Sequence, residues 1–455
     1  MKKLGMLKTY KSDEINDSYI SIGFECIDRE LINPDKCYDL LAETGVKYAR
    51  CQTGWARCEK EKGIYDFTWL DSIVDNLLSR GIKPWLNVGY GNPVYMKDIP
   101  NPTGVGCVPI FYGEETLIAW KNFVKEIAIR YKDKVSHYEI WNESDIGHFW
   151  YPEQPNGKEY AKFVKLTGKV IREVNPNAKI GGNVSNAYKI SFMREFLSEV
   201  DKKYLDFFAI HVYTTVPEYR YSSIIYKLRK MFDEKGLHDV EFWQGEGGYP
   251  SWAYEGHWLA KDGCDDERPQ AVWQLRRYFL DVFNGLKLSS FFQIADMWEK
   301  PYEKAVEVIK KPAAHGILNG ITYTPKKSYE TISHLSAIFN GDLKPSDYYM
   351  DVNVNSPTTL EFLSPINMTF EKNGTPIYSY YMPTEIGKPF EYSYKLVLST
   401  LDHLDNPVVI DMYSGEVFSI EKENVVYCNG FESYTDLPIK DYPIIVTDRS
   451  VIEIV

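Results

Sequence analysis

The chain has 455 residues, of which 44% are hydrophobic and 25% charged, and its formal net charge is −12. One hydrophobic core stops growing near roughly 250–300 residues, so this length predicts a large domain and a smaller one. The negative balance argues against a nucleic-acid or anionic-membrane partner, because phosphate binding needs a basic surface.

Cysteine spacing and targeting patterns exclude further classes. The seven cysteines form no Cys-x-x-Cys pair and no Cys/His cluster, so we expect no disulfide framework, no metal site and no cofactor. The N-terminus is basic but lacks the apolar stretch of a secretory signal, and no run of about 18 apolar residues could span a membrane. These features predict a cytoplasmic protein.

Eight short apolar runs follow one another along the first two thirds of the chain. Segments with helical periodicity separate the runs, and three of these segments are residues 116–131, 157–176 and 268–285. The second of them ends at a proline, and the third has a proline near its start and a glycine at its end. The apolar runs lie at 19–24, 46–50, 83–88, 136–141, 178–183, 205–213, 240–245 and 288–294.

Strands that alternate with helices predict a parallel sheet with right-handed crossovers. Eight such units predict a closed (β/α)8 barrel, the TIM-barrel α/β fold, over residues 19–335. No Gly-x-Gly-x-x-Gly motif follows the first run, which weakens a dinucleotide-binding alternative. Residues 336–455 show short alternating runs broken by turn residues and predict a C-terminal antiparallel β-sandwich. Residues 1–18 belong to no barrel unit and are expected to pack on the sandwich.

Polar residues stand at the ends of the predicted barrel strands, where such barrels build their active sites. Glu143 follows the fourth strand in Tyr-Glu-Ile-Trp-Asn-Glu, and Glu246 follows the seventh in Gly-Glu-Gly-Gly. Alone, either glutamate is an ordinary loop residue. Together they could face each other across the barrel mouth, as two carboxylates do in glycosidic bond cleavage. The other strand-end candidates are Arg50, Asn87, Tyr90, Asn142, Asn183, His211, Tyr213, Asp296 and Trp298.

Several motifs resemble a known group of enzymes. Ile-Trp-Asn-Glu on the fourth strand, with a glutamate on the seventh, resembles the clan of retaining (β/α)8 glycoside hydrolases. The segment 63–93 and the run Phe-Phe-Ala-Ile-His-Val-Tyr are most similar to family-39 glycosidases of the β-xylosidase and α-iduronidase type. The resemblance implies an O-glycosyl hydrolase that acts on oligo- or polysaccharides by double displacement through a glycosyl-enzyme intermediate.

The same resemblance implies roles for individual residues. Glu143 would be the acid/base and Glu246 the nucleophile, while Asn142 would bind the sugar 2-hydroxyl. Arg50 and Tyr213 would support Glu246, His211 would contact the sugar or Glu143, and Trp298 would form the floor of the subsite. Asn183 is a further substrate-binding candidate. One departure concerns the nucleophile: the family usually has Thr-Glu, where this chain has Gly245-Glu246.

Three alternatives to this function are considered. A catalytically inactive carbohydrate-binding barrel is disfavoured because both acids and their neighbours are present, and a transglycosylase would use the same intermediate. A metal-dependent barrel hydrolase would need His-x-His on the first strand, which ends instead in Gly-Phe-Glu-Cys-Ile-Asp. The sequence leaves open the sugar, exo or endo action, and whether the chain forms a homo-oligomer.

Overall fold

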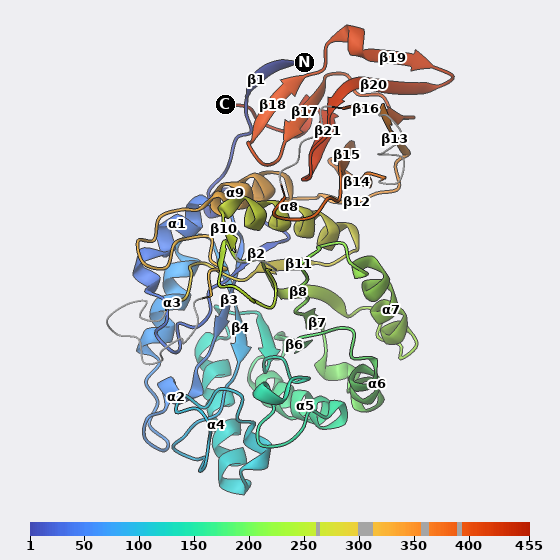
Figure 1. Cartoon of the computed structure of the whole chain (residues 1–455). Coiled ribbons are helices and arrows are strands. Elements are labelled where there is room, and N and C mark those ends of the chain that lie inside the picture. The colour runs from blue at the N-terminus through green and yellow to red at the C-terminus, as the bar shows by residue number, and fades with distance from the viewer. Residues whose placement is uncertain (261–263, 299–312, 356–363, 389–393) are drawn as a thin grey trace.

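The chain folds into a helix-wrapped barrel with a β-rich unit beside it, as the computed structural model in Figure 1 shows. The structure describes residues 1–260, 264–298, 313–355, 364–388 and 394–455. Residues 356–363 and 389–393 of the predicted sandwich therefore lie outside the described residues. Within the described parts, no helix has both the length and the apolar character needed to cross a membrane.

Eight parallel strands close the barrel, which confirms the predicted TIM-barrel fold. The closed order β11-β2-β3-β4-β5-β6-β7-β8 follows the chain, with β11 completing the ring between β8 and β2. Trp85, Phe207 and Trp243 pack together inside with Leu288, so the interior is a packed core. The strands are β2 (Ile20–Gly23), β3 (Tyr48–Gln52), β4 (Lys83–Val88), β5 (His137–Ile140), β6 (Lys179–Val184), β7 (Phe207–Ile210), β8 (Glu241–Gly247) and β11 (Leu288–Phe291).

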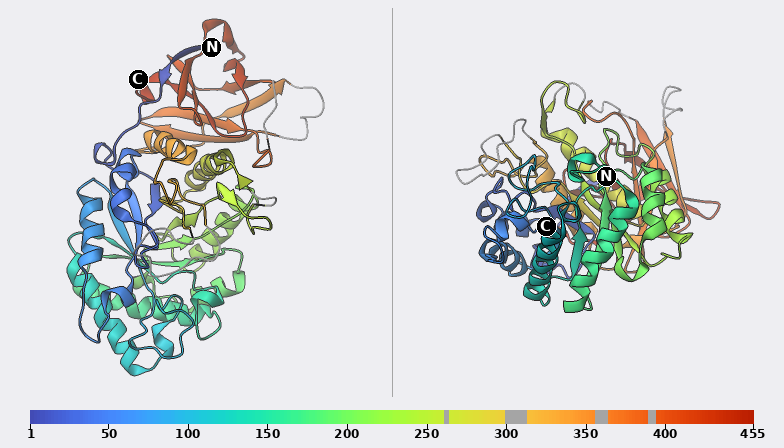
Figure 2. Two further views of the ribbon diagram at one scale, coloured as in Figure 1. Left: turned by 60° about the vertical axis from the view of Figure 1, so that its left-hand side comes forward. Right: turned by 90° about the horizontal axis from the view of Figure 1, so that it is seen from below.

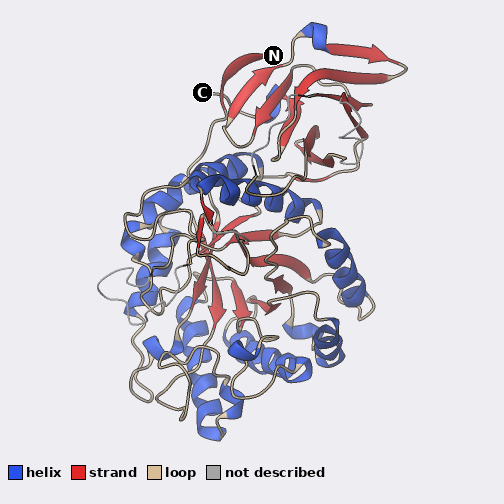
Figure 3. Ribbon diagram, viewed as in Figure 1, coloured by secondary structure: helices blue, strands red, loops and turns tan. Residues whose placement is uncertain are grey.

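Helices surround the barrel, as Figure 3 shows in blue. Asn156 caps α5 by accepting hydrogen bonds from two backbone N–H groups, and the helix ends just before Pro176. In α4, Phe123 is buried but Ile118 is 51% exposed. The two residues are five positions apart, so their side chains point in directions that differ by roughly 140° around the helix axis. The helices are α1 (Tyr38–Glu43), α2 (Trp55–Cys58), α3 (Thr68–Leu78), α4 (Glu114–Tyr131), α5 (Gly157–Val174), α6 (Ile190–Glu199), α7 (Tyr221–Asp233), α8 (Glu267–Phe283) and α9 (Lys327–Ile338).

The C-terminal region forms two antiparallel sheets, consistent with the predicted β-sandwich. One sheet has the order β1-β18-β17-β21-β15-β14-β12 and the other β13-β16-β20-β19. The first strand of the chain is an edge strand that pairs with β18. The strands are β1 (Lys2–Met6), β12 (Lys344–Pro345), β13 (Met350–Asn355), β14 (Ile366–Lys372), β15 (Thr375–Tyr381), β16 (Lys395–Thr400), β17 (Pro407–Asp411), β18 (Glu416–Ser419), β19 (Val425–Cys428), β20 (Phe431–Pro438) and β21 (Ile444–Asp448).

Helices α8 and α9 lie between the barrel and the sheets, as Figure 1 and the left view of Figure 2 show. The rings of Phe279 in α8, Phe339 after α9 and Phe370 in β14 pack edge-to-face. Arg268 in α8 forms an ion pair of 2.6 Å with the buried Asp441. Apolar and charged contacts therefore both join the sheets to the helices of the barrel.

Candidate active site

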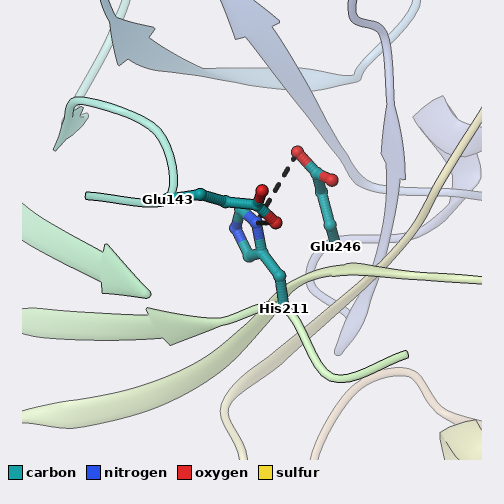
Figure 4. A group of neighbouring side chains, drawn as sticks. All are labelled: Glu143, His211 and Glu246. Carbon is teal, nitrogen blue, oxygen red and sulfur yellow. Dashed lines mark hydrogen bonds and ion pairs between the residues drawn. The ribbon is translucent and has the colours of Figure 1, made fainter. Parts of the chain in front are cut away.

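Three titratable side chains converge at the carboxyl end of the barrel strands (Figure 4). Glu143 follows β5, His211 directly follows β7, and Glu246 lies near the end of β8. One side-chain atom from each of the three lies within 4.8 Å of the other two. The two glutamates predicted from strand ends therefore share one small site, and the histidine lies between them.

The backbone around Glu143 adopts an uncommon conformation. Trp141 and Glu143 have positive φ angles of 69° and 45°, which non-glycine residues rarely adopt. The Asn183 amide holds this turn: it donates to the carbonyl oxygen of Trp141 and accepts from the N–H of Glu143, both at 2.6 Å. Asn183 is fully buried and both of its amide atoms are occupied by backbone. These two bonds give Asn183 a role in positioning Glu143.

The surroundings of Glu143 favour its protonated form. Its side chain is only 12% exposed, and Oε1 lies 3.1 Å from Nδ1 of His211. Burial is the largest influence and raises the pKa of Glu143, although the His211 contact opposes the rise. A carboxyl group with a raised pKa can donate a proton as a general acid.

Glu246 is held in the opposite protonation state. Oε1 accepts a hydrogen bond of 2.5 Å from Nη1 of Arg50, and Oε2 accepts one of 3.2 Å from the Tyr213 hydroxyl. Burial alone would raise the pKa of Glu246, but the charges of His211 and Arg50 hold it below the usual range. An ionised carboxylate with its lone pairs directed by fixed donors is a competent nucleophile.

Arg50 is the fully buried cation that organises the site. Its guanidinium donates to Glu25, Glu139 and Glu246, and Nη2 also donates to Oδ1 of Asn142 at 2.9 Å. The contact with Asn142 fixes the amide that precedes Glu143. A planar group with five N–H donors can hold several acceptors at set angles, which explains why arginine occupies this position.

His211 connects the acid groups. Its Nδ1 lies 3.1 Å from Glu143 and 3.7 Å from Glu246, and its Nε2 lies 3.9 Å from Glu139. Burial opposes protonation, but the surrounding carboxylates raise the pKa of His211 to about 10. The imidazole would therefore be protonated near neutral pH, which suits acid–base chemistry and disfavours metal ligation through this ring.

The glycine before Glu246 has a steric reason. A Cβ at Gly245 would lie 2.8 Å from Nε2 of His211 and 3.0 Å from Cβ of Ala209. The backbone of β8 thus approaches the imidazole too closely for a side chain. This close packing against His211 is the physical reason for glycine at the position where the family usually has threonine.

The two candidates that follow β11 have other recorded partners. Asp296 forms a buried ion pair of 2.7 Å with Lys326, and the ring of Trp298 packs 5.6 Å from that of Trp252. Among the described residues, no recorded contact joins Trp298 to Glu143 or Glu246. The ring of Phe292, directly after β11, lies 6.5 Å from that of Tyr213.

Sequence reasoning missed one carboxyl group of this site. Glu25, just after β2, is buried and accepts from the same Arg50 nitrogen as Glu246. Its position at the end of the first strand was the available signal. Glu139, inside β5, also contacts Arg50, through Oε2.

Comparisons with known proteins agree with the family resemblance and the fold. Residues 34–242 match the model of Glycosyl hydrolases family 39, which confirms the resemblance that the motifs indicated. A β-xylosidase of Geobacillus stearothermophilus is 23% identical over 169 residues, 34% of this chain and 32% of the relative. A β-xylosidase of Caldicellulosiruptor saccharolyticus is 23% identical over 334 residues, 68% of this chain and 64% of the relative. The chain thus spans less than two thirds of the length of either relative.

Solved structures share the fold over almost the whole chain. A family 39 glycoside hydrolase from Bacteroides cellulosilyticus WH2 superposes with a TM-score of 0.69 at 15% identity, covering 97% of this chain and 83% of the other. A GH30 endoxylanase from Clostridium papyrosolvens C71 gives a TM-score of 0.59 at 10% identity, covering 98% of each chain. At these identities the superpositions establish only the fold, which is the barrel with its β-rich unit. They do not establish which reaction the side chains of the site perform.

Proposed function

We propose that this chain is a retaining glycoside hydrolase of the β-xylosidase type, with Glu143 as acid/base and Glu246 as nucleophile. The observation that carries the proposal is the pair of buried glutamates whose pKa values are displaced in opposite directions. Two carboxyl groups whose environments separate their protonation states are the requirement for this chemistry. The catalytic unit would be the barrel over 19–335, with 1–18 and 336–455 forming the sandwich unit.

The separation of the carboxylates supports retention of configuration. Retaining enzymes place the carboxyl groups about 5–5.5 Å apart, whereas inverting enzymes leave about 6.5–9.5 Å for a water molecule. An oxygen of Glu143 and an oxygen of Glu246 lie within 4.8 Å of each other. Direct attack by Glu246 fits this spacing better than activation of an intervening water.

The first chemical step forms a bond to the enzyme. Glu246 attacks the anomeric carbon while Glu143 gives its proton to the departing glycosidic oxygen, and the sugar becomes esterified to Glu246. The pair of electrons of the broken bond leaves with that oxygen. As Glu143 becomes ionised, the imidazolium of His211 at 3.1 Å stabilises its new charge.

The second step reverses these roles. Glu143, now a carboxylate, takes a proton from a water molecule, which attacks the anomeric carbon and releases Glu246. Arg50 and Tyr213 stabilise the returning carboxylate through the same hydrogen bonds that prepared it for attack. Because Arg50 occupies Oδ1 of Asn142, the Asn142 amide nitrogen is the atom available to a sugar hydroxyl.

Xylose-containing oligosaccharides are the proposed substrates because both curated relatives are β-xylosidases. The test is hydrolysis of an aryl β-xyloside followed by proton NMR. A first-formed product with the β configuration supports the proposal. A first-formed α anomer overturns the nucleophilic role of Glu246, and no hydrolysis across a panel of aryl glycosides would favour a carbohydrate-binding barrel. Transfer of the sugar to an added alcohol would measure the transglycosylase alternative.

A further inference from the structure

The site holds more acid groups than its cations can balance. Glu25, Glu139, Glu143 and Glu246 surround Arg50 and His211, so four ionised carboxylates with two cations would leave a net charge of −2. An uncompensated charge in a buried site is strongly unfavourable. Two of the four carboxyl groups therefore need to be neutral for the cluster to balance.

The contacts distinguish the ionised groups from the neutral ones. Glu139 accepts from Arg50 through Nε at 2.8 Å and lies 2.7 Å from Nη2, and Glu246 has both Arg50 and Tyr213 as donors. Among the residues that the structure describes, Glu25 has only one such contact, 2.8 Å from Nη1 of Arg50, and its buried Oε1 has no recorded hydrogen-bond partner. A carboxyl group with the fewest donors is the one least able to keep a charge.

Glu25 and Glu246 are neighbours because both accept from Nη1 of Arg50. We propose that Glu25 is a neutral carboxylic acid that donates a hydrogen bond to Glu246, and so positions and tunes the nucleophile. This inference rests on the proposed function, because it assigns Glu246 the nucleophilic role. It adds a third acid group to the pair that performs the proposed reaction.

The pKa shifts of Glu25 and Glu246 agree with a neutral Glu25 beside an ionised Glu246. Burial, the largest influence, raises the pKa of Glu25 well above its usual range, against the opposing charge of Arg50. For Glu246, burial is again the largest influence and is outweighed by His211 and Arg50, with a hydrogen bond from Glu25 adding to the lowering of its pKa. Six other titratable groups in the described part of the chain surround Glu25. They are Cys26, which follows it in the chain, Arg50 and Cys51 from β3, His211 and Tyr213 after β7, and Glu246 from β8.

The backbone leaves space for this carboxyl group. A Cβ at Gly23 would lie 2.8 Å from Oε1 of Glu25 and 3.3 Å from Cβ of Gln293. Any larger residue at the end of β2 would displace Glu25 from Arg50 or press on the segment after β11. The glycine therefore has a packing role that depends on Glu25 being where it is.

The hydrogen bond would act in both halves of the reaction. A donor at Glu246 favours its ionised form before attack, so the nucleophile is ready at a lower pH. When the glycosyl ester breaks, the same donor stabilises the carboxylate that leaves. Glu25 is thus a positioning residue: its proton stays on Glu25 throughout, and no bond to the substrate is required.

The test compares two substitutions of similar length in the full chain. Glu25→Gln keeps a donor, so the acid limb of the kcat/KM–pH profile should stay in place. Glu25→Met removes the donor and should move that limb upward by about one pH unit, the shift expected for losing one hydrogen bond to a buried charge. A downward shift in Glu25→Gln would mean that a negative charge had been removed, and it would overturn the proposal, as would identical profiles for the two variants.

A second readout does not depend on turnover. The infrared spectrum of the native protein minus that of Glu25→Gln at neutral pH should contain the carbonyl band of a protonated carboxyl group. Absence of that band overturns the proposal even if Glu25→Met fails to fold. The control is Glu115→Gln, whose side chain is 70% exposed and which should remove no such band. If the native chain hydrolyses no glycoside, the proposed function fails while the infrared result still decides the state of Glu25.

Discussion

Replacing Tyr213 by phenylalanine removes one of the donors that prepare Glu246. The phenol donates to Oε2 over 3.2 Å, which is long for an O–H···O bond. Hydrogen bonds to charged groups contribute about 1.5–3 kcal/mol, so this long one is placed at the lower end, about 1.5 kcal/mol. Since 1.36 kcal/mol corresponds to one pKa unit, the pKa of Glu246 should rise by about one unit in Tyr213→Phe.

The sign of this effect can be checked directly. Glu246 must be ionised to attack, so a raised pKa moves the acid limb of kcat/KM to higher pH by about one unit, with the basic limb unchanged. The assay is the pH dependence of kcat/KM on an aryl β-xyloside. Tyr226→Phe is the control, because Tyr226 is 71% exposed. An acid limb that stays in place or moves downward in Tyr213→Phe would refute the reasoning.

Three further substitutions probe the other parts of the site. Glu143→Gln should lose about 10²–10⁴ in kcat/KM on substrates with poor leaving groups, together with the basic limb of the pH profile, and added azide should restore turnover; an intact basic limb would contradict the acid role. Arg50→Met should lower the free energy of unfolding by about 3–5 kcal/mol in urea titrations, because it leaves buried carboxylates unpaired. The control is Arg194→Met, because Arg194 is exposed. Equal stability of the two variants would contradict the ion cluster. Gly245→Ala should cost about 1–3 kcal/mol in the same titration and lower kcat, since its Cβ would crowd His211. Gly147→Ala, where a Cβ meets nothing within 4 Å, should behave like the native protein, and the reasoning fails if the two alanine variants are alike.

The barrel could be predicted from sequence because its strands recur with helices between them. Each of the eight apolar runs overlaps a barrel strand, although boundaries differ by a few residues, as at β3, which continues to Gln52. Strand ends then located Glu143 and Glu246, since parallel strands bring their carboxyl ends to one rim. The pattern of residues 116–131 predicted a helix, but Ile118 lies five residues before Phe123 and so off its buried face.

What the sequence could not predict depends on contacts between strands. The role of Glu25 depends on its contact with Arg50, and the role of Asn183 depends on its contact with the turn at Trp141. The spacing of residues along the chain does not show which side chains make these contacts. The charge balance of the site also requires counting groups from β2, β3, β5, β7 and β8 together. A motif shows where an acid group lies in the chain, but the side chains packed around that group determine whether it is protonated.

The central claim, that Glu246 becomes covalently bound to the sugar, can be tested by trapping. An aryl 2-deoxy-2-fluoro-β-xyloside slows release of the intermediate, because fluorine destabilises the cationic transition state of both steps while the good leaving group keeps the first step fast. Mass spectrometry of the intact protein should show one added fluorosugar, and peptide mapping should place it on Glu246. Labelling of another residue, or turnover of ordinary xylosides with no trapped species, would contradict the account.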